Sequence, residues 1–314
     1  MSVLEVRDVV KRYSKVTAVD RVSFRVPEGT VFGLLGPNGA GKTSIIRMIT
    51  GITRPDEGQI FVKGQAVGTS TVREVGYMPE ERGLYKKMRV GEHLLYLARL
   101  KGLSKAEATE RITYWFERFD IGSWSERRIE ELSKGMQQKV QFIATVVHDP
   151  TLIILDEPFS GLDPINANLI KDEIDGLAAR GKQILFSTHR MEQVEEIWDH
   201  IVLVNQGRNV LEGEVEAIRR SFSEHRYAVQ VDGELPAELL AEFEVVSSDP
   251  AAGRYQLRLP ETSDQYKVLH ALLSGGYRVR EFRELLPSLN EVFIRQVNTQ
   301  TDTPVPTDHL PKGL

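Results

Sequence analysis

A glycine-rich stretch near the N-terminus constrains the fold of this chain more than any other part of its sequence. Residues 36–43 read Gly-Pro-Asn-Gly-Ala-Gly-Lys-Thr, between an apolar run of strand length at 31–35 and helical apolar spacing at 44–49. Glycines let backbone N–H groups surround a polyphosphate, and the N-terminus of the next helix adds a partial positive charge. Strand, glycine loop and helix therefore predict a phosphate-binding loop and a nucleoside triphosphate ligand.

Within this loop the charged and hydroxyl side chains have distinct expected roles. Lys42 is expected to reach the outer phosphates, and the Thr43 hydroxyl to hold a magnesium ion. The other predicted nucleotide-binding positions are Gly36, Pro37, Asn38, Gly39, Ala40, Gly41 and Ser44.

Composition excludes several other classes of protein. The 314 residues are 41% hydrophobic and 27% charged, as in an ordinary globular protein with room for a large core and a second small domain. No apolar run reaches the roughly 18 residues of a membrane-spanning helix, and the N-terminus lacks a signal-peptide layout. The absence of cysteine excludes disulfides and thiolate metal sites. We therefore expect a cytoplasmic protein, and the net charge of -5 does not favour nucleic-acid binding.

Two carboxylates follow the most apolar strand that the sequence predicts. Residues 152–155 are four consecutive aliphatics, which indicates a parallel strand buried on both faces, and Asp156 and Glu157 come directly after it. Ligands of α/β sheets bind at the carboxyl ends of such strands. His189 follows another predicted strand, at 183–187, so it is expected near the same edge.

The predicted architecture is an α/β domain with a mixed sheet at 1–220, interrupted by an all-helical insertion at about 88–148. A small α+β domain is expected at 221–298, with strands at 226–231, 254–259 and 277–282. The Thr- and Pro-rich segment 299–314 is expected to be a disordered tail.

Inside the insertion, Ser104 and Glu107 predict a helix N-terminus with a capping box. Ile112, Trp115, Phe116 and Phe119 continue the apolar face of that helix and are expected to be core residues.

In this order the motifs resemble those of ABC-type ATPases, and the resemblance covers roughly residues 1–220. Residues 36–43 match the Walker A motif, and 152–157 match Walker B. Residues 132–136, Leu-Ser-Lys-Gly-Met, are similar to the family signature, usually Leu-Ser-Gly-Gly-Gln, and 160–163 match the D-loop.

The resemblance implies ATP hydrolysis, with magnesium held by Thr43 and Asp156. It implies that Glu157 polarises the attacking water and that His189 contacts the terminal phosphate. Tyr13 falls at the position of the family's adenine-stacking aromatic residue.

The family also implies a head-to-tail homodimer with two ATP molecules between the subunits. Ser133 and Gly135 would then touch the ATP of the second copy, and Asp163 of the D-loop is expected to belong to the same composite site. Two departures from the pattern are Lys134 and Met136, which replace Gly and Gln of the signature.

A third departure is Glu80, which stands where the family normally has a glutamine that touches magnesium. An added carboxylate near the metal would tighten magnesium binding, or slow hydrolysis by repelling phosphate. Alternatively, Glu80 faces solvent and couples only mechanically.

Residues 77–85, Tyr-Met-Pro-Glu-Glu-Arg-Gly-Leu-Tyr, and 287–290, Pro-Ser-Leu-Asn, narrow the resemblance. They are similar to bacterial ATP-binding subunits of exporters of the sodium-efflux type, which carry a small C-terminal domain. The resemblance implies export of sodium or another small substrate and a separate membrane permease, contacted through residues 80–90 and the helical insertion. It also implies a peripheral location on the inner face of the membrane.

Three other functions compete with this interpretation. Soluble ABC-type ATPases of translation or DNA repair generally join two ATPase units or insert coiled coils or zinc modules, and this chain shows one unit and no cysteine. A P-loop kinase would leave the signature motif without a purpose. A regulatory module that holds ATP without turnover would not need both Glu157 and His189.

Overall fold

The computed structural model of the chain describes residues 2–81, 83–191, 199–235, 240, 243–259 and 265–301. The chain divides into two compact units, Met1–Glu214 and Val215–Leu314, called here the first and the second unit. In the part of the chain that is described, no helix has the length and apolar character to cross a membrane.

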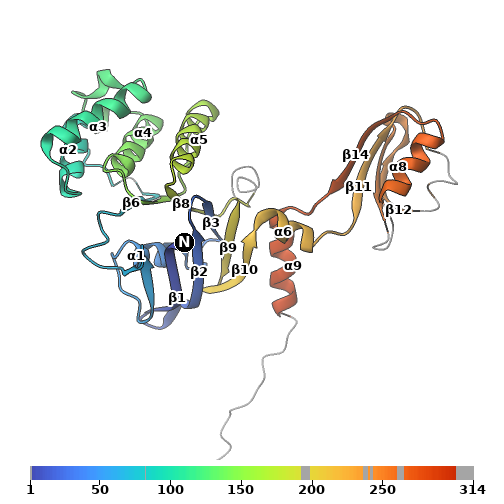
Figure 1. The fold of residues 1–314 in the computed structure, drawn as a ribbon, viewed down its shortest axis with the longest axis horizontal. Coiled ribbons are helices and arrows are strands. Elements are labelled where there is room, and N and C mark those ends of the chain that lie inside the picture. The colour runs from blue at the N-terminus through green and yellow to red at the C-terminus, as the bar shows by residue number, and fades with distance from the viewer. Residues whose placement is uncertain are drawn as a thin grey trace, which may run out of the picture. The chain divides into compact units, whose positions relative to one another are not determined.

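The first unit combines two sheets with a helical layer (Figure 1). Its strands are β1 (Ser2–Tyr13), β2 (Val16–Pro27), β3 (Val31–Leu35), β4 (Glu57–Val62), β5 (Gln65–Ala66), β6 (Val75–Met78), β7 (Leu152–Asp156), β8 (Gln183–Thr188), β9 (His200–Asn205) and β10 (Arg208–Glu214). Its helices are α1 (Lys42–Ile49), α2 (Val90–Leu100), α3 (Lys105–Arg118), α4 (Lys134–Val146) and α5 (Pro164–Ala179), with short 3₁₀ turns at Gly122–Trp124 and Ile129–Glu131.

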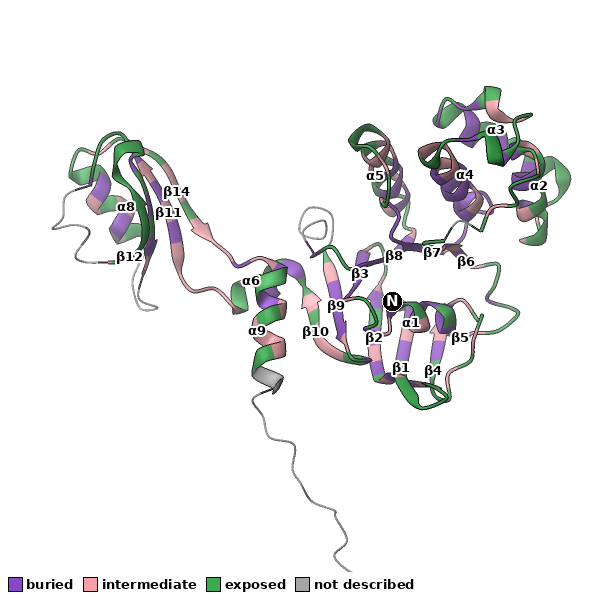
Figure 2. Cartoon of the chain, turned by 180° about the vertical axis from the view of Figure 1, so that it is seen from behind, coloured by how far each residue is buried: buried purple, intermediate pink, exposed green. Residues whose placement is uncertain are grey.

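A six-stranded mixed sheet carries the predicted phosphate loop. Its order is β10-β9-β3-β8-β7-β6, and every neighbouring pair is parallel except β10 and β9. Every residue of β3, β7 and β8 is buried, as Figure 2 shows for the latter two. The predicted mixed sheet is confirmed, and its parallel strands place the ends of β3, β7 and β8 along one edge.

The second sheet of this unit is antiparallel, with the order β2-β1-β4-β5. The alternation of the sequence marks only parts of β1 and β2, because the register shifts between Val6 and Val9, where Asp8 adopts a left-handed backbone with φ 45°. This bulge changes which face the following side chains point to, so Val9 and Val10 are both buried. Because the bulge interrupts the alternation of apolar and polar residues, the sequence pattern does not reveal the full length of the β1–β2 hairpin.

Helices α2, α3 and α4 form the predicted helical insertion and lie side by side in Figures 1 and 2. The predicted capping box is confirmed, since the Ser104 side chain accepts a hydrogen bond from the Glu107 N–H at 3.2 Å and the Glu107 carboxylate accepts one from the Ser104 N–H at 2.8 Å. The predicted aromatic core is also present, and Trp115 and Phe119 both pack on Phe142 of α4.

The second unit has a four-stranded antiparallel sheet with the order β12-β13-β11-β14. Its elements are α6 (Val215–Ser221), β11 (Arg226–Val231), β12 (Glu244–Asp249), a 3₁₀ turn (Pro250–Ala252), β13 (Arg254–Arg258), α8 (Gln265–Ser274), β14 (Val279–Leu285) and α9 (Leu289–Thr301). The sequence did not predict β12, because all six of its residues are exposed on an edge strand and leave no apolar period.

Some predicted features need adjustment or lie outside the description. Helix α9 extends to Thr301, three residues into the segment expected to form a tail, and 302–314 lie outside the described residues. The sequence also predicts helices at 191–198 and near 236–243, and residues 192–198 and most of 236–243 lie outside the described residues.

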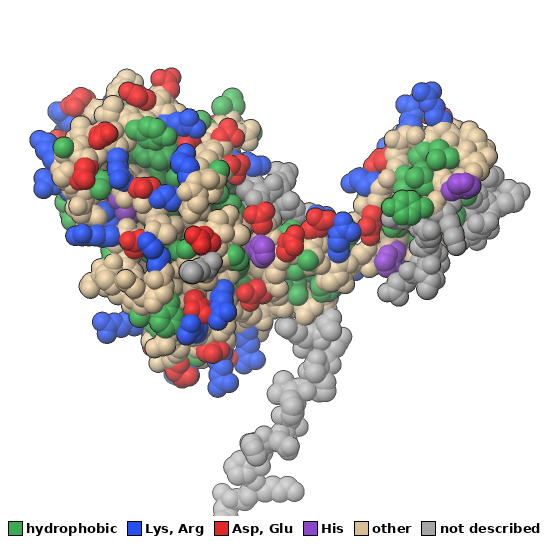
Figure 3. Space-filling view, viewed as in Figure 1, with side chains coloured by type: hydrophobic (Ala, Val, Ile, Leu, Met, Phe, Trp, Pro, Cys, Tyr) green, Lys and Arg blue, Asp and Glu red, His purple; other side chains and the backbone are tan. Residues whose placement is uncertain are grey.

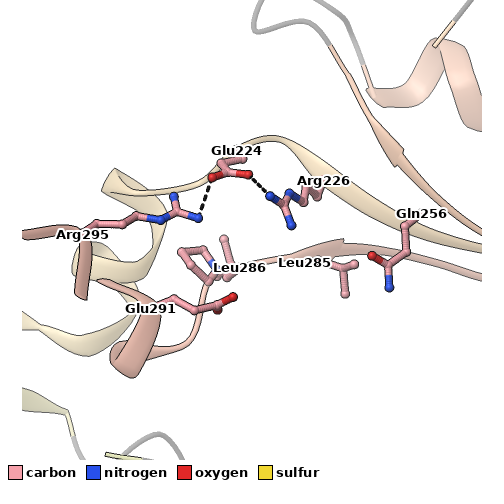
Figure 4. Close-up of a pocket in the computed structure, with 8 residues that line it drawn as sticks. Glu224, Arg226, Gln256, Leu285, Leu286, Glu291 and Arg295 are labelled. Atoms are coloured by element: carbon pink, nitrogen blue, oxygen red, sulfur yellow. Dashed lines mark ion pairs between the residues drawn. The ribbon is translucent and has the colours of Figure 1, made fainter. Parts of the chain in front are cut away.

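In the second unit, one carboxylate pairs with three guanidinium groups, and two of these, Arg226 and Arg295, line a hollow together with it (Figure 4). Glu224 forms ion pairs with Arg226 of β11, with Arg258 of β13 at 3.1 Å and with Arg295 of α9 at 2.5 Å. Burial disfavours the charged carboxylate, but the hydrogen bond from Arg226 and the charge of Arg295 hold the pKa of Glu224 below its ordinary value. Glu224 therefore ties α9 to the sheet.

We expect Glu224→Gln to reduce the local opening free energy of β11 and α9 by about 1–2 kcal/mol, because the neutral amide leaves the three arginines without their shared carboxylate. Hydrogen exchange of these segments in the full chain measures the loss. Glu216→Gln is the control, since Glu216 pairs with Arg220 while both side chains are 61% exposed. Equal protection in the two variants would contradict the role of Glu224.

Candidate active site

The loop between β3 and α1 is shaped by glycines that no other residue could replace without a clash. Gly36 has φ 149°, and a Cβ on it would lie 2.1 Å from the Val204 carbonyl oxygen. Gly41, the N-cap of α1, has φ 108°, and its Cβ would lie 2.5 Å from the Ala18 carbonyl oxygen. Only glycine fits these two positions, so the loop can pack directly against the backbone of β9 and β2.

Lys42 is folded back onto this loop. Its ammonium group donates hydrogen bonds to the carbonyl oxygens of Gly36 at 2.7 Å and of Pro37 at 3.0 Å. Burial lowers the pKa of Lys42, while the charges of Glu157, Asp156 and Glu80 act in the opposite direction. Among the described residues this cation has only carbonyl partners, although three carboxylates lie near it, and an anionic ligand would offer it stronger ones.

The two predicted carboxylates lie at the end of β7. Asp156 is 5% exposed and Glu157 is 8% exposed. Glu157 adopts a left-handed backbone with φ 49°. Such a conformation in a glutamate costs on the order of 1 kcal/mol or more, and strain of this kind is concentrated at functional sites.

Three bonds fix the Glu157 carboxylate to the end of β8. One oxygen accepts from the Thr188 hydroxyl at 3.0 Å. The other accepts from the His189 N–H at 2.9 Å and lies 2.5 Å from Nδ1 of the His189 ring. Because a carboxylate only accepts hydrogen bonds, Nδ1 carries a proton in this contact. Glu157 and His189, 32 residues apart, thus act as one hydrogen-bonded pair.

One hollow of about 200 Å³ brings most of the predicted site residues together. It is lined by Ala18, Asn38, Gly39, Ala40, Gly41, Lys42, Thr43, Ser44, Glu80, Asp156, Glu157 and His189. Burial raises the pKa of Asp156 to about 6, and the nearby Glu80 and Glu157 carboxylates act in the same direction. Glu80 therefore faces the site as well as solvent.

The remaining predicted residues do not line this hollow. Gly36 and Pro37 reach it only through their contacts with Lys42. Tyr13 lies at the end of β1 with 39% of its surface exposed. Its role in stacking on a base stays a prediction.

Ser133, Gly135 and Asp163 also lie outside the hollow. Ser133 is the exposed N-cap of α4, and its hydroxyl accepts from the Met136 N–H at 3.3 Å. Asp163 is the exposed N-cap of α5 and accepts from the Asn166 N–H at 3.0 Å. A Cβ on Gly135 would lie 3.6 Å from Leu162 and 3.8 Å from Asn166, so the signature lies beside the D-loop.

Sequence reasoning missed three residues that complete the site. Thr188 holds Glu157, and Ala18 closes the loop side of the hollow. Gln138 of α4 donates to the Pro158 carbonyl at 2.9 Å, which links the signature helix to the end of Walker B. The pattern Ser-Thr-His at the end of β8 was the available signal for Thr188, but the other two contacts depend on the packing of distant segments.

The residues of the hollow fit a magnesium-bound nucleotide. The N-terminus of α1 has no side-chain cap and no acidic residue in its first turn, so its N–H groups are available to phosphate oxygens. No group of three or more His, Cys, Asp or Glu side chains able to hold a metal occurs among the described residues. Magnesium would therefore need phosphate oxygens in addition to the Thr43 hydroxyl and Asp156.

Comparison with known proteins places this geometry in a family. The family described as ABC transporter matches residues 19–160, and the ATP-binding protein DrrA1-3-like, C-terminal domain, matches residues 213–297. The "Uncharacterized ABC transporter ATP-binding protein YhaQ" of Bacillus subtilis (strain 168) is 42% identical over 295 residues, which is 94% of this chain and 98% of that protein. This chain is an ABC transporter ATP-binding protein. A "Nod factor export ATP-binding protein I" of Rhizobium sp. (strain N33) is 34% identical over 298 residues, or 93% of this chain and 96% of that protein.

Solved structures agree with this assignment. The ATP-binding subunit of an ABC transporter superposes with a TM-score of 0.66 at 34% identity, covering 70% of this chain and 93% of that one. ABC ATPase domains bind ATP with Mg²⁺ and hydrolyse it. The chain is accordingly the ATP-binding subunit of an ABC transporter, and a role as a soluble ATPase of translation or DNA repair is not favoured.

Proposed function

We propose that two copies of this subunit hydrolyse ATP between them to drive export through a separate membrane permease. The observation that carries the proposal is the single hollow in which the phosphate loop, both Walker B carboxylates and His189 converge. Support for export comes from the Nod factor export relative, which matches the chain over 93% of its length. The name of that relative refers to Nod factor and not to sodium, so export of sodium by this protein stays a prediction.

The residues that line the hollow would have different roles in ATP hydrolysis. Lys42 would leave the carbonyls of Gly36 and Pro37 for the outer phosphates, and Thr43 with Asp156 would hold Mg²⁺, which neutralises charge on the phosphate oxygens. Glu157, oriented by Thr188 and His189, would orient the attacking water and accept its proton.

Residues outside the hollow support the proposal of a dimer. Ser133 and Asp163 are exposed helix N-caps of the first unit that do not line their own nucleotide site. Helix N-termini favour phosphate ligands, and ligand sites occur where surfaces meet. We infer that the N-terminus of α4 closes over the ATP of the second copy, in a head-to-tail homodimer.

The permease is proposed to dock in a groove between the helical insertion and the sheet, called here the insertion groove. It encloses about 330 Å³, and its walls include Ile52, Tyr77, Leu84, Leu97 and Leu100. Figure 3 shows hydrophobic side chains exposed among charged ones over this insertion. Apolar walls of this kind suit an amphipathic helix of a partner.

A hydrogen bond connects this groove to the active site. Gln141 of α4, which lines the groove, donates to the Pro79 carbonyl at 2.6 Å. Pro79 immediately precedes Glu80, which lines the nucleotide hollow. Movement of a docked segment can therefore reach the nucleotide, and the subunit would work at the inner face of the membrane beside its permease.

The docking proposal is tested with Leu100, which is 62% exposed at the groove. We expect Leu100→Glu to lower retention of the subunit on permease-containing vesicles by about tenfold, because it places a charge against apolar surface. Leu273→Glu is the control, since Leu273 is a similarly exposed leucine in the second unit. Basal ATPase of both variants should match the unmodified protein, and equal retention would contradict docking at this groove.

Glu80 provides a separate test of the metal site. We expect Glu80→Gln to raise the Mg²⁺ concentration for half-maximal ATPase by about 3- to 10-fold, because it removes a carboxylate that lines the hollow together with Asp156. Glu81→Gln changes the adjacent exposed carboxylate and is the control. If the two variants have the same Mg²⁺ dependence, Glu80 acts only mechanically.

A further inference from the structure

The wall of the insertion groove contains polar atoms that the chain itself leaves unsatisfied. Gln141 is 4% exposed and His148 is 8% exposed, and both line the groove. Gln141 Oε1 and both ring nitrogens of His148 have no hydrogen-bond partner among the described residues. Buried polar groups are nearly always paired, so an unpaired cluster beside a hollow indicates a ligand that supplies the partners.

A cation completes this cluster. Lys101, at the end of α2, lines the same groove and donates to the carbonyl oxygens of Val72 at 2.7 Å and Val75 at 2.8 Å. Its ammonium group has a third donor, and no described carboxylate forms an ion pair with it. Burial lowers the pKa of Lys101, as expected for a cation without a counter-charge.

The charges around His148 are also predominantly positive. Burial lowers the pKa of His148 to about 4, and the charges of Lys101 and Arg111 act in the same direction. The Val75 carbonyl forms no hydrogen bond to the His148 ring. This carbonyl and the charge of Asp149 act to raise the pKa of His148, but they offset the lowering only in part. The groove therefore offers hydrogen-bond donors and positive potential within largely apolar walls.

We propose that the segment of the permease that docks in the insertion groove carries an Asp or Glu side chain that pairs with Lys101 and His148. This inference rests on the proposed docking of a permease at this groove. A carboxylate only accepts hydrogen bonds, so it satisfies the free donor of Lys101 and one nitrogen of His148 together. Charge-assisted bonds of this kind are about twice as strong as neutral ones. An N–H group of the same segment would satisfy Gln141 Oε1.

Photo-crosslinking identifies the docking segment. A benzoylphenylalanine at position 100 is introduced into the chain in its source organism, and the cross-linked peptide is sequenced. The expected product is a non-membrane-spanning segment of a membrane protein with an Asp or Glu near the cross-link. A permease segment without any acidic residue would overturn the inference and leave the proposed function standing. Cross-linking to no membrane protein would overturn both.

Charge exchange tests the pairing itself. With the permease so identified in vesicles, changing its acidic residue to the amide should weaken binding of the subunit at least tenfold, and this change leaves the folding of the subunit untouched. Lys101→Glu should weaken binding similarly, and acid-to-Lys on the permease should restore it. Lys105→Glu, at an exposed position on α3, is the matched control. Unchanged binding of the amide variant of the permease, or absence of rescue with a folded Lys101→Glu subunit, would contradict the pairing.

Discussion

Replacing Glu157 with glutamine is expected to reduce ATP hydrolysis by about 100- to 1,000-fold while ATP binding is retained. The amide keeps the size of the side chain and can still contact Thr188 and His189, but it accepts no proton from water. Because ATP then persists at the interface, we expect the variant to form a dimer in ATP and to remain monomeric in ADP. Phosphate release and size-exclusion chromatography with light scattering measure the two effects.

Two controls separate this result from loss of structure. Glu126→Gln alters a carboxylate of the helical insertion that is 76% exposed, and hydrolysis should be unchanged. A structure of the Glu157→Gln protein with ATP should place Ser133 of one copy beside the phosphates bound by the other. Hydrolysis at more than about one third of the normal rate would remove Glu157 from the proposed chemistry. A dimer in which Ser133 lies remote from the phosphates would contradict the proposed head-to-tail dimer.

Lys42→Ala is expected to weaken ATP binding by about 10- to 100-fold, because hydrogen bonds to charged groups contribute about 1.5–3 kcal/mol each. The effect should be specific to the outer phosphates. Titration with a fluorescent ATP analogue and with AMP shows whether the loss of affinity depends on the outer phosphates. AMP should bind equally to the unmodified protein and to the Lys42→Ala variant.

The matched control is Lys63→Ala, which removes a lysine that is 51% exposed and lies outside the hollow. Lys42 also bonds the Gly36 and Pro37 carbonyls, so thermal unfolding is measured in parallel. Equal losses of ATP and AMP affinity would show that the substitution collapses the loop. Unchanged ATP affinity would exclude Lys42 from phosphate binding.

Much of the site was predictable because its residues lie in short, contiguous sequence motifs. The backbone conformations next to β3 and α1 require glycine at positions 36 and 41. The spacing of these glycines is therefore visible directly in the sequence. Asp156 and Glu157 follow a strand that is buried at every position, so the apolar run marks their place at the edge of the sheet. The all-helical insertion was predictable for the same reason, since its apolar faces repeat at helical spacing.

Other features left no local trace. Strand β12 is exposed at every residue, so burial imposed no period on it, and a bulge in β1 shifted the phase of the hairpin. Whether Glu80 faces solvent or magnesium could not be settled from its neighbours in sequence, because the answer depends on where β6 ends relative to β7.

The sequence alone determined that this chain has a phosphate loop, a buried strand ending in two carboxylates, and a helical insertion, because each is a short-range pattern imposed by backbone conformation or by burial. Only the tertiary structure decided that Glu157 is held by His189, that Lys42 is folded onto its own loop, and that Lys101, Gln141 and His148 share one groove. These are contacts between side chains whose partners are chosen by packing. A residue's type limits the bonds it can make, but the fold selects which of them it makes.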